Sequence, residues 1–267
     1  MSVVNLRGKR VVVTGASRGI GAALARAFRD AGAVVALVAR TEDTLTELAN
    51  ELGGTAHIAD LSDPAEVATL FADIEDQAGP VDVLVNNAAD VVVAGFASVH
   101  ADELHKVTQV NYLAAAELCR QAIPRMLQRN GGHIVNVSSL MGCTNLPGLL
   151  VYSASKAALS HFTAGLRVDL RGLPISTTLV ELGPIPTDML AKTKTYEPTA
   201  RSFRRLHYTG ALVAIPAEKV AERTVIAVQK GRKHVRLPKR AAAVSMIVEI
   251  PRRATEFVLT GMSHQAT

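Results

Sequence analysis

Short apolar runs alternate with longer segments of helical periodicity from Arg10 to Glu181. Apolar runs bounded by glycine, proline or polar residues are typical of strands that are buried on both faces. The longer segments repeat apolar residues about every three to four positions, which is typical of helices with one buried face. Strands are predicted at Arg10 to Thr14, Ala33 to Ala39, Thr55 to Ala59, Val81 to Asn86, His133 to Ser138 and Ile175 to Glu181. Helices are predicted through Ala22 to Phe28, at Glu42 to Leu52, after Asp63-Pro64, at Ala101 to Arg129 and at Tyr152 to Arg171.

The alternation of strand and helix determines the expected architecture. Apolar strands separated by helices imply a parallel sheet covered by helices on both faces, which is an α/β fold. A chain of 267 residues can bury one core of this kind, so a second domain is not required. In such a sheet the ligand lies beyond the carboxyl ends of the strands. Functional residues are therefore expected where strands end.

Composition and charge narrow the classes of function. The chain is 48% hydrophobic and 20% charged, which is typical of globular proteins. The net charge of +5 and the pI near 9.4 fit an anionic partner, and a phosphorylated cofactor is the modest explanation. Aromatic residues make up only 4% and tryptophan is absent, so stacking platforms for single-stranded nucleic acid are not expected. No nucleic-acid partner is predicted.

Cysteine, histidine and the first residues bear on compartment and metal binding. Cys119 and Cys143 form no C-x-x-C motif and no disulfide framework, which favours a reducing compartment. The segment from Met1 to Lys9 lacks the apolar centre of an export signal, and no apolar stretch approaches the roughly 20 residues of a membrane span. None of the eight histidines lies in an H-E-x-x-H motif or at ligand spacing from a cysteine. A cytoplasmic protein without a metal site is expected.

A glycine-rich turn, Thr14-Gly15-Ala16-Ser17-Arg18-Gly19-Ile20-Gly21, follows the first predicted strand directly. Glycines lack a Cβ, so they allow a tight turn and the close approach of a pyrophosphate to the backbone. The helix that begins there presents free N–H groups and a positive dipole end. The spacing is G-x-x-x-G-x-G and not the commoner G-x-G-x-x-G. Its place between strand and helix predicts cofactor binding, with a merely tight turn as the alternative.

Tyr152 and Lys156 lie four positions apart in a predicted helix. Residues at this spacing share a helix face. An ammonium beside a phenol favours the phenolate, which lowers the pKa of the tyrosine from about 10 toward the range where it can exchange a proton near neutrality. The two residues are therefore a candidate device for proton transfer. Taken alone, an ordinary surface pair is the plainer interpretation.

Five motifs in one order decide between these alternatives. They are Thr14 to Gly21, Asn86-Asn87-Ala88-Ala89, Asn111, Val137-Ser138-Ser139 and Tyr152-Ser153-Ala154-Ser155-Lys156. Together they resemble the short-chain dehydrogenase/reductase family, from about residue 8 to residue 235. The resemblance implies a single Rossmann-type, doubly wound parallel sheet over residues 1–237, and a homodimer or homotetramer is common in such families. It also implies a nicotinamide cofactor and hydride transfer to or from a carbonyl carbon.

The resemblance assigns catalytic roles to four residues. Tyr152 is implied to exchange a proton with the substrate oxygen, and Lys156 to hold the ribose hydroxyls and keep the pKa of the tyrosine low. The reactive serine is implied to be Ser139, with Ser138 as the alternative, and it would hydrogen-bond the substrate oxygen where negative charge develops. Asn111 is implied to bind a water that links Lys156 to solvent, with an ordinary helix asparagine as the alternative.

Charge at the end of the second strand bears on the choice of cofactor. The 2′-phosphate of NADP(H) needs a cation at this position. The ribose of NAD(H), which has a free 2′-hydroxyl, instead prefers a carboxylate that accepts a hydrogen bond from it. The strand ends at Ala39-Arg40, and Arg18 lies in the glycine turn, so NADP(H) is expected over NAD(H), with two solvated arginines as the alternative. The cofactor-binding residues that the motifs and the resemblance imply are Gly15, Ser17, Arg18, Gly19, Ile20, Gly21, Arg40, Asp60, Leu61, Asn87, Tyr152, Lys156, Gly183 and Thr187.

The chain departs from the family pattern after the sixth strand. There the family has Pro-Gly before a threonine that binds the carboxamide, and this chain has Leu182-Gly183 before Thr187. Gly183 and Thr187 match the pattern, and Leu182 replaces the proline. A shifted turn is expected.

Two segments lie outside the motifs. Residues 188–215 are polar and irregular in pattern, and we interpret them as a mobile lid over the substrate. After an expected last strand at His234 to Leu237, residues 238–267 form an extension with basic residues around an apolar run, Ala241 to Ile250. A helix packed on its own or a partner subunit is the plainer interpretation of the extension. A peripheral membrane contact, or a wall of an apolar substrate site, is the alternative.

These inferences combine into one functional expectation. We expect an NADP(H)-dependent oxidoreductase that acts on a small-molecule carbonyl or alcohol with a hydrophobic, acyl, sterol-like or other lipid-like body. A non-catalytic nicotinamide-binding regulator or scaffold with the same fold is the alternative. The presence of Asn111, Ser139, Tyr152 and Lys156 together favours the enzyme, since a non-catalytic protein has no chemical need for all four.

Overall fold

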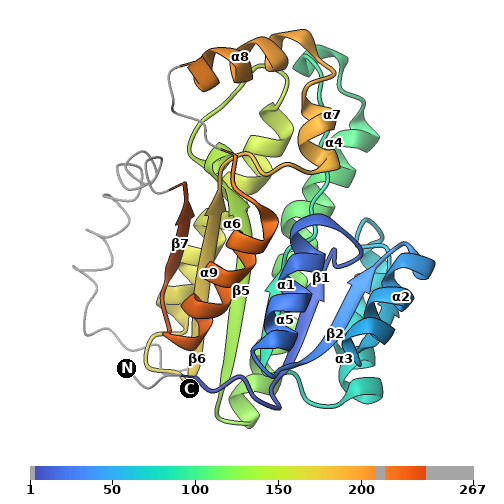
Figure 1. Cartoon of the computed structure of the whole chain (residues 1–267), viewed down its shortest axis with the longest axis vertical. Helices are drawn as coiled ribbons and strands as arrows, with labels where there is room; N and C mark the ends of the chain where they lie inside the picture. Colours follow the sequence, from blue (N-terminus) through green and yellow to red (C-terminus); the bar gives the residue numbers. More distant parts are fainter. Residues whose placement is uncertain (1–3, 209–213, 239–267) are drawn as a thin grey trace.

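Seven parallel strands form one sheet in the computed structural model, which describes residues 4–208 and 214–238 (Figure 1). The strands are β1 (Arg10–Thr14), β2 (Val34–Ala39), β3 (Thr55–Ile58), β4 (Val83–Asn86), β5 (Gly132–Ser139), β6 (Ile175–Leu182) and β7 (His234–Leu237). Their order across the sheet is β3-β2-β1-β4-β5-β6-β7. The direction in which the chain adds strands therefore reverses at β1, and a ligand crevice is expected at the carboxyl ends of β1 and β4.

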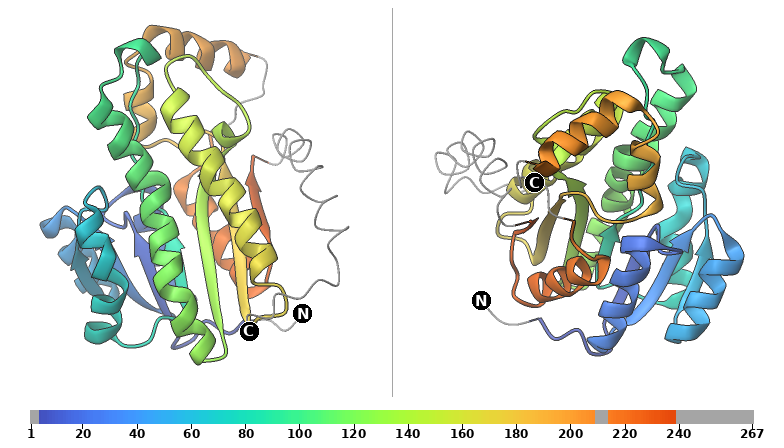
Figure 2. Two further views of the ribbon diagram at one scale, coloured as in Figure 1. Left: turned by 180° about the vertical axis from the view of Figure 1, so that it is seen from behind. Right: turned by 45° about the horizontal axis from the view of Figure 1, so that its top comes forward.

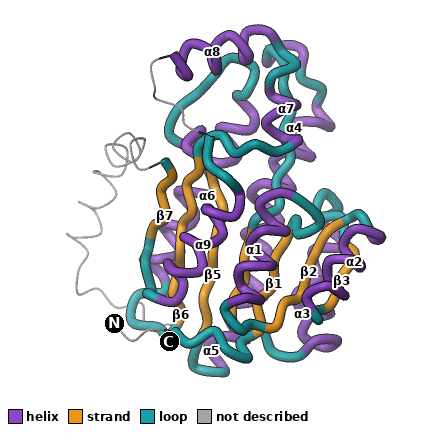
Figure 3. The backbone as a smooth tube through the Cα atoms, viewed as in Figure 1, coloured by secondary structure: helices purple, strands orange, loops and turns teal. Residues whose placement is uncertain are grey.

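Helices cover both faces of this sheet, as Figure 1 and the left view of Figure 2 show from opposite sides. The α-helices of the described residues are α1 (Gly19–Asp30), α2 (Glu42–Leu52), α3 (Pro64–Ala78), α4 (Ala101–Thr108), α5 (Ala114–Gln128), α6 (Leu150–Asp169), α7 (Asp188–Thr193), α8 (Glu197–Tyr208) and α9 (Ala217–Gln229). Apolar residues of α1, α2 and α9 pack on one face, and those of α3, α5 and α6 on the other. Helices α7 and α8 lie beyond the carboxyl ends of the strands (Figure 3).

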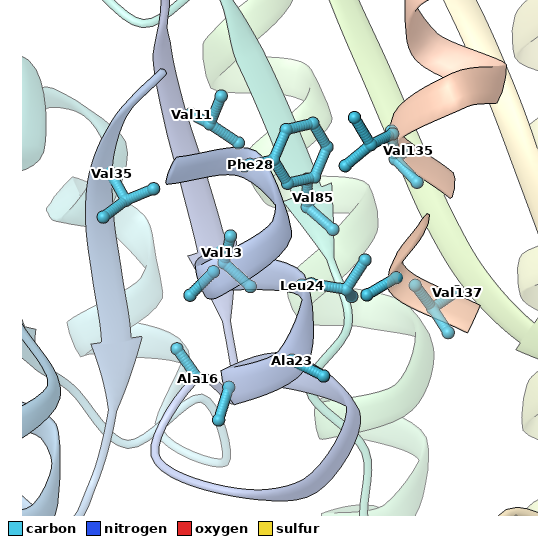
Figure 4. Close-up of a cluster of buried hydrophobic side chains, with 14 of the residues drawn as sticks. Val11, Val13, Ala16, Ala23, Leu24, Phe28, Val35, Val85, Val135 and Val137 are labelled. Atoms are coloured by element: carbon cyan, nitrogen blue, oxygen red, sulfur yellow. The ribbon is translucent and has the colours of Figure 1, made fainter. Parts of the chain in front are cut away.

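The apolar pattern produces one core on each face of the sheet. On the face covered by α1, Phe28 and Leu24 point toward the strands and lie over Val13, Val85 and Val135 (Figure 4). Phe28 and Leu24 are both fully buried. Burying a side chain of this size stabilises the fold by roughly 1.5–3 kcal/mol. These contacts fix where the first helix begins relative to the ends of the strands.

The structure confirms the predicted α/β fold, and each predicted strand is present with bounds that differ by at most two residues. Helix α2 has the predicted bounds, and it ends at Gly53, whose φ of 58° is a left-handed conformation that glycine adopts without strain. Asp63 caps α3, because its side chain accepts a hydrogen bond of 2.8 Å from the backbone N–H of Ala65. Local capping and apolar periodicity were sufficient for these elements.

The predicted continuous helix from Ala101 to Arg129 is wrong in one respect. A π-helical turn, η2 (Gln109–Leu113), separates α4 from α5. Such a turn inserts one residue into the helix and shifts every later side chain around the axis. An apolar pattern with a period near 3.6 tolerates that shift, so the sequence did not reveal it.

Residues 188–208 consist of α7 and α8 joined by a short turn, so the predicted irregular character of this segment is also wrong. Helix α8 places Phe203 and Leu206 toward the protein while Arg201, Arg204 and Arg205 are exposed. The few apolar residues of α8 are spaced for a helix, but the polar residues between them hid that spacing. A further part of the predicted lid, residues 209–213, lies outside the described residues.

The predicted last strand, His234 to Leu237, is present as β7 and pairs with β6. Of the predicted extension, residues 239–267 lie outside the described residues. Within residues 4–208 and 214–238, none of the helices has the length and apolar character that crossing a bilayer requires. The same described residues contain no cluster of histidine, cysteine and acidic side chains placed to bind a metal ion.

Replacing Phe28 by alanine is expected to lower the free energy of unfolding by about 3–5 kcal/mol, because it leaves a cavity between α1 and the sheet. Urea denaturation at one protein concentration measures this change. Phe96→Ala is the matched control, since Phe96 is 57% exposed and its truncation should change stability by less than about 0.5 kcal/mol. Equal effects of the two substitutions would contradict the packing described for α1.

Candidate active site

A cleft of about 970 Å³ opens at the carboxyl ends of the strands. The glycine turn, the first turns of α6, the segment after β6 and helix α7 line it. Of the residues predicted for the site, only Asn111 does not line this cleft. The predicted residues that do are Gly15, Ser17, Arg18, Gly19, Ile20, Gly21, Arg40, Asp60, Leu61, Asn87, Ser139, Tyr152, Lys156, Gly183 and Thr187.

The glycine turn leaves no room for side chains at two positions. A Cβ at Gly21 would lie 2.0 Å from the carbonyl oxygen of Gly15, and a Cβ at Gly15 would lie 2.8 Å from the Cα of Ala88. Gly15 also has a φ of 65°, which L side chains rarely adopt. The turn therefore presents bare backbone at the N-terminus of α1, which is a favourable environment for an anionic group.

Hydrogen bonds between the ends of β1 and β4 hold the glycine turn in place. The backbone N–H groups of Asn87 and Ala88 both donate to the Oγ1 of Thr14, each over 3.0 Å. The side-chain Nδ2 of Asn87 donates to the carbonyl oxygens of Thr14 and Gly15, over 2.9 and 3.3 Å. Asn87 thus positions the turn through its side chain, in addition to lining the cleft.

Tyr152 and Lys156 lie on the side of α6 that faces β5 and the cleft. Lys156 is only 2% exposed, and its Nζ donates a hydrogen bond of 2.9 Å to the carbonyl oxygen of Val137. The same nitrogen is 6.0 Å from the centre of the Tyr152 ring. The two residues are therefore not a solvated surface pair.

Burial controls the ionisation of both groups. It lowers the pKa of Lys156 from 10.5 to about 8, because the buried ammonium loses its hydration. Burial also raises the pKa of Tyr152, and a hydrogen bond with Ser139 offsets this only in part. The expected lowering of the pKa of Tyr152 is therefore not found. The ammonium is held by Val137, and desolvation of the phenol dominates.

The two candidate serines have different surroundings. The hydroxyl of Ser139 shares a hydrogen bond with Tyr152, accepts from the backbone N–H of Met141 over 3.1 Å and donates to the carbonyl oxygen of Leu182 over 3.3 Å. The hydroxyl of Ser138 instead donates to the carbonyl oxygen of Lys156 over 2.9 Å and contacts the Oγ of Ser160. Ser139 is therefore the serine beside the phenol, and Ser138 joins β5 to α6.

Asn111 lies in the π-helical turn η2 and is almost fully buried. Its Oδ1 accepts from the backbone N–H of Asp90 over 2.7 Å, and its Nδ2 donates to the carbonyl oxygen of Asp90 and to the Oγ of Ser155, each over 2.9 Å. The side chain thus joins the segment after β4 to α6. Its implied role as a water ligand stays a prediction, and these contacts give it a positioning role as well.

Each of the two arginines expected at a 2′-phosphate has an acidic neighbour. Arg40 lies at the end of β2 with its Nη1 3.6 Å from the Oδ2 of Asp60, and Arg18 pairs with Asp188 of α7 over 3.0 Å. Both arginine side chains are more than half exposed, so these ion pairs contribute little to stability. The guanidinium groups remain open to an anion with higher charge.

The segment after β6 follows the strand without a break. Leu182, which replaces the proline of the family pattern, is the last residue of β6 and is buried in the core. The N–H of Gly183 then donates to the carbonyl oxygen of Leu237 over 2.7 Å. Thr187 lies against the glycine turn, since its Cγ2 would be 3.3 Å from a Cβ at Gly19. Leucine therefore extends the strand, and Thr187 still reaches the cofactor side of the cleft.

A family model described as short chain dehydrogenase matches residues 9–198. The chain belongs to the short-chain dehydrogenase family. Residues outside the match include helix α9 and strand β7, and β7 completes the sheet at one edge.

Curated relatives of this short-chain dehydrogenase include two proteins of Mycobacterium tuberculosis. One, described as an uncharacterized oxidoreductase, is 37% identical over 203 residues, which cover 72% of this chain and 59% of the relative. The other, described as a fatty acyl-CoA reductase, is 35% identical over 239 residues, which cover 85% of this chain and 81% of the relative. The matched part of the chain thus spans about three fifths of the length of the first relative. These matches agree with the family that the model over residues 9–198 shows.

Solved structures of short-chain dehydrogenases agree with this fold and include both nicotinamide cofactors. One is a short-chain dehydrogenase/reductase from Burkholderia phymatum in complex with NAD, with a TM-score of 0.79 and 25% identity over 99% of this chain and 100% of that one. Another is a metagenomic short-chain oxidoreductase in complex with NADP, with a TM-score of 0.72 and 29% identity over 88% of this chain and 98% of that one.

Sequence reasoning on this short-chain dehydrogenase missed one group of cleft residues. Asp90, Lys106 and Lys192 all line the cleft, and both lysines lie within 4 Å of the Asp90 carboxylate, at 3.8 and 3.9 Å. The three residues come from the segment after β4, from α4 and from α7, and no spacing rule links them. The position of Asp90 just after Asn86 to Ala89 was the one signal in the sequence that could have drawn attention to it.

The low pKa of Lys156 predicts a specific dependence of stability on pH. Below about pH 8 both the folded and unfolded chains carry the charge, and the folded protein is penalised for burying it. Between pH 8 and 10.5 the unfolded chain binds more protons, so the penalty disappears as the pH rises. From pH 7 to pH 10, the free energy of unfolding of the wild type should therefore rise by about 2–3 kcal/mol relative to Lys156→Met. Chemical denaturation at the two pH values measures this.

The control for this measurement is Lys194→Met, at an exposed lysine. Its stability relative to the wild type should not change between the two pH values. A constant difference for Lys156→Met as well would contradict the assigned burial of the ammonium.

Proposed function

We propose that this short-chain dehydrogenase is an NADP(H)-dependent enzyme that transfers a hydride between nicotinamide and a carbonyl or secondary alcohol of a hydrophobic substrate. One observation carries the proposal: the phenol of Tyr152 has Ser139 beside it and Lys156 one helical turn away, in the same cleft as the glycine turn. The cleft lies at the carboxyl ends of strands, where ligands of such sheets bind.

The residues present fit a nicotinamide dinucleotide. The glycine turn is a cradle that a Cβ at Gly15 or Gly21 would fill, and it opens onto the N-terminus of α1, which favours a pyrophosphate. Asp60 and Leu61 line the same cleft after β3, and Thr187 lines it beside Gly19. When bound, the nicotinamide supplies or accepts the hydride.

The residues of the chain handle the proton and the developing charge. Tyr152 donates its proton to the carbonyl oxygen in reduction and accepts it in oxidation. Ser139 hydrogen-bonds the same oxygen, where negative charge develops. Lys156 would hold the ribose hydroxyls of the cofactor, and its positive charge would favour the phenolate form of Tyr152 when the phenol gives up its proton. Burial raises the pKa of Tyr152, which keeps the proton on the phenol available for donation.

The preference for NADP(H) rests on charge. Arg40 follows β2 directly, the strand ends in Ala39 without an acid, and Arg18 lies across the same part of the cleft. A phosphate carries more charge than the carboxylates of Asp60 and Asp188, and it accepts bidentate hydrogen bonds from arginine. It should therefore displace these weak surface partners.

The preference for a hydrophobic substrate rests on the cleft wall beyond Tyr152. There Val91, Val110, Leu149, Met189, Leu190 and Phe203 present apolar surface. Apolar linings with few polar groups are typical of sites for small organic ligands. One relative is described as a fatty acyl-CoA reductase, and a fatty acyl group is hydrophobic.

Assembly and location complete the proposal. A homodimer or homotetramer in the cytoplasm stays the expectation. For residues 238–267, a helix packed on its own or a partner subunit stays the plainer interpretation, with a peripheral membrane contact or a wall of an apolar substrate site as the alternative. Of the extension, residues 239–267 lie outside the described residues.

Tyr152→Phe is expected to reduce kcat by at least about 100-fold, because it removes the proton donor. The measurement is NADPH oxidation with a panel of aliphatic and aromatic carbonyl compounds, with NADPH binding followed separately by fluorescence. The phenylalanine variant should still bind NADPH. If both proteins bind NADPH and neither reduces any member of a broad panel, the protein acts as a nicotinamide-binding regulator or scaffold.

Arg40→Asp is expected to weaken NADPH binding more than NADH binding, by a factor of about 10 or more in the ratio of dissociation constants. The reason is that the substitution replaces a phosphate ligand with a repelling charge. Arg205→Asp, at an exposed residue of α8 that does not line the cleft, is the control for the change in net charge. An unchanged ratio in Arg40→Asp would remove this arginine from the phosphate site.

A further inference from the structure

Three charged side chains meet on one wall of the cleft and have no part in the hydride transfer. They are Asp90 after β4, Lys106 of α4 and Lys192 of α7. The Nζ of Lys106 is 3.8 Å from the Oδ2 of Asp90, and the Nζ of Lys192 is 3.9 Å from the Oδ1. Two cations therefore share one carboxylate, and the group carries a net charge of +1.

Neither lysine is saturated by this carboxylate. Both distances exceed the 2.7–3.2 Å of ordinary N–H to O hydrogen bonds. Lys192 donates one hydrogen bond, of 2.6 Å, to the carbonyl oxygen of Val91, and an ammonium has three donors. The side chains of Lys106 and Lys192 are 46% and 57% exposed, so a ligand can reach them.

Hydrogen bonds with nearby backbone and side-chain groups fix the orientation of the Asp90 carboxylate. Its Oδ1 accepts the N–H of Val91 over 2.8 Å, and Asn111 holds both the N–H and the carbonyl of Asp90. The acid is therefore a fixed counter-ion that keeps the two ammonium groups at the cleft wall. An incoming anion competes with it for the same donors.

The surroundings of the two lysines define the ligand further. Val91, Val110, Met189 and Leu190 line the same part of the cleft. Apolar walls reduce the screening of a charge by water, which strengthens its interaction with an anion. A molecule that fits has an apolar body and one negatively charged group.

We propose that Lys106 and Lys192 make this short-chain dehydrogenase selective for substrates that carry an anionic oxygen group, a carboxylate or a phosphate, and that Asp90 is the counter-ion this group displaces. The inference rests on the proposed function, since it names the substrate class of that site. The competing explanation is that the charges only hold α7 against the segment after β4.

Binding measurements with matched ligand pairs test the proposal on the full-length protein. One pair is a medium-chain 3-oxo acid and its methyl ester, and the other is a 3-oxoacyl-CoA and the corresponding 3-oxoacyl pantetheine without phosphate. Isothermal titration calorimetry gives the ratio of neutral to anionic dissociation constants for each pair. The first pair reports a carboxylate and the second a phosphate, so the pair that shows a preference identifies the source of the charge.

The variants are expected to change this ratio in opposite directions. Lys192→Met and Lys106→Met should each lower it about tenfold, because each removes a charge-assisted hydrogen bond. Asp90→Asn should raise it several-fold, because the amide keeps the acceptor for Val91 and removes the competing charge. Lys194→Met, at an exposed lysine two residues after Lys192 that does not line the cleft, should leave the ratio unchanged.

Two results would overturn the proposal. One is a wild-type protein that binds both members of each pair equally. The other is an Asp90→Asn variant that lowers the ratio as the lysine variants do, which is what a purely structural ion-pair group would give. NADPH oxidation with the same compounds tests the proposed function separately: selective binding without any turnover would contradict the hydride transfer and leave the anion site intact.

Discussion

The hydrogen bonds between Thr14 and Asn87 join the ends of β1 and β4, and the geometry of the cleft depends on them. The order of strands in the sheet reverses at β1, so helices that follow β1 and β4 diverge to opposite faces and leave a crevice. Without a link across it, the glycine turn would be free to move relative to β4. Asn87 provides the link by holding the carbonyls of Thr14 and Gly15.

From this link a series of hydrogen bonds extends to Tyr152. Asp90 follows Asn87 by three residues, and Asn111 grips the backbone of Asp90 while donating to Ser155 of α6. Ser155 in turn donates to the carbonyl oxygen of Tyr152 over 2.7 Å. On the other side of α6, the Nζ of Lys156 is tied to Val137 of β5. The glycine turn and the phenol of Tyr152 are therefore positioned by one continuous set of contacts, in which Asn111 connects Asp90 with α6.

The sequence predicted the parts of this arrangement that local patterns encode. Strand runs, the cap at Asp63, the left-handed end of α2 at Gly53 and the glycine turn follow from periodicity and from single residues, and all of these elements are present. The π-helical turn was not predictable, because one inserted residue leaves the apolar spacing of the flanking helices intact. The ionisation of Tyr152 was mispredicted for a related reason: the spacing of Tyr152 and Lys156 gives their common face but not the position of Val137, which holds the ammonium.

Lys106 and Asn111 are close in the chain and contact different parts of the molecule. Lys106 precedes the π-helical turn and reaches the cleft, while Asn111 within the turn is directed to the buried joint between Asp90 and α6. In an uninterrupted helix, residues five positions apart lie about 140° apart around the axis, and an extra residue in one turn alters that angle. Asp90 is held through its backbone by Asn111, while its carboxylate faces Lys106. Asp90 therefore connects the lysines of the cleft wall with Asn111 and, through Asn111, with α6.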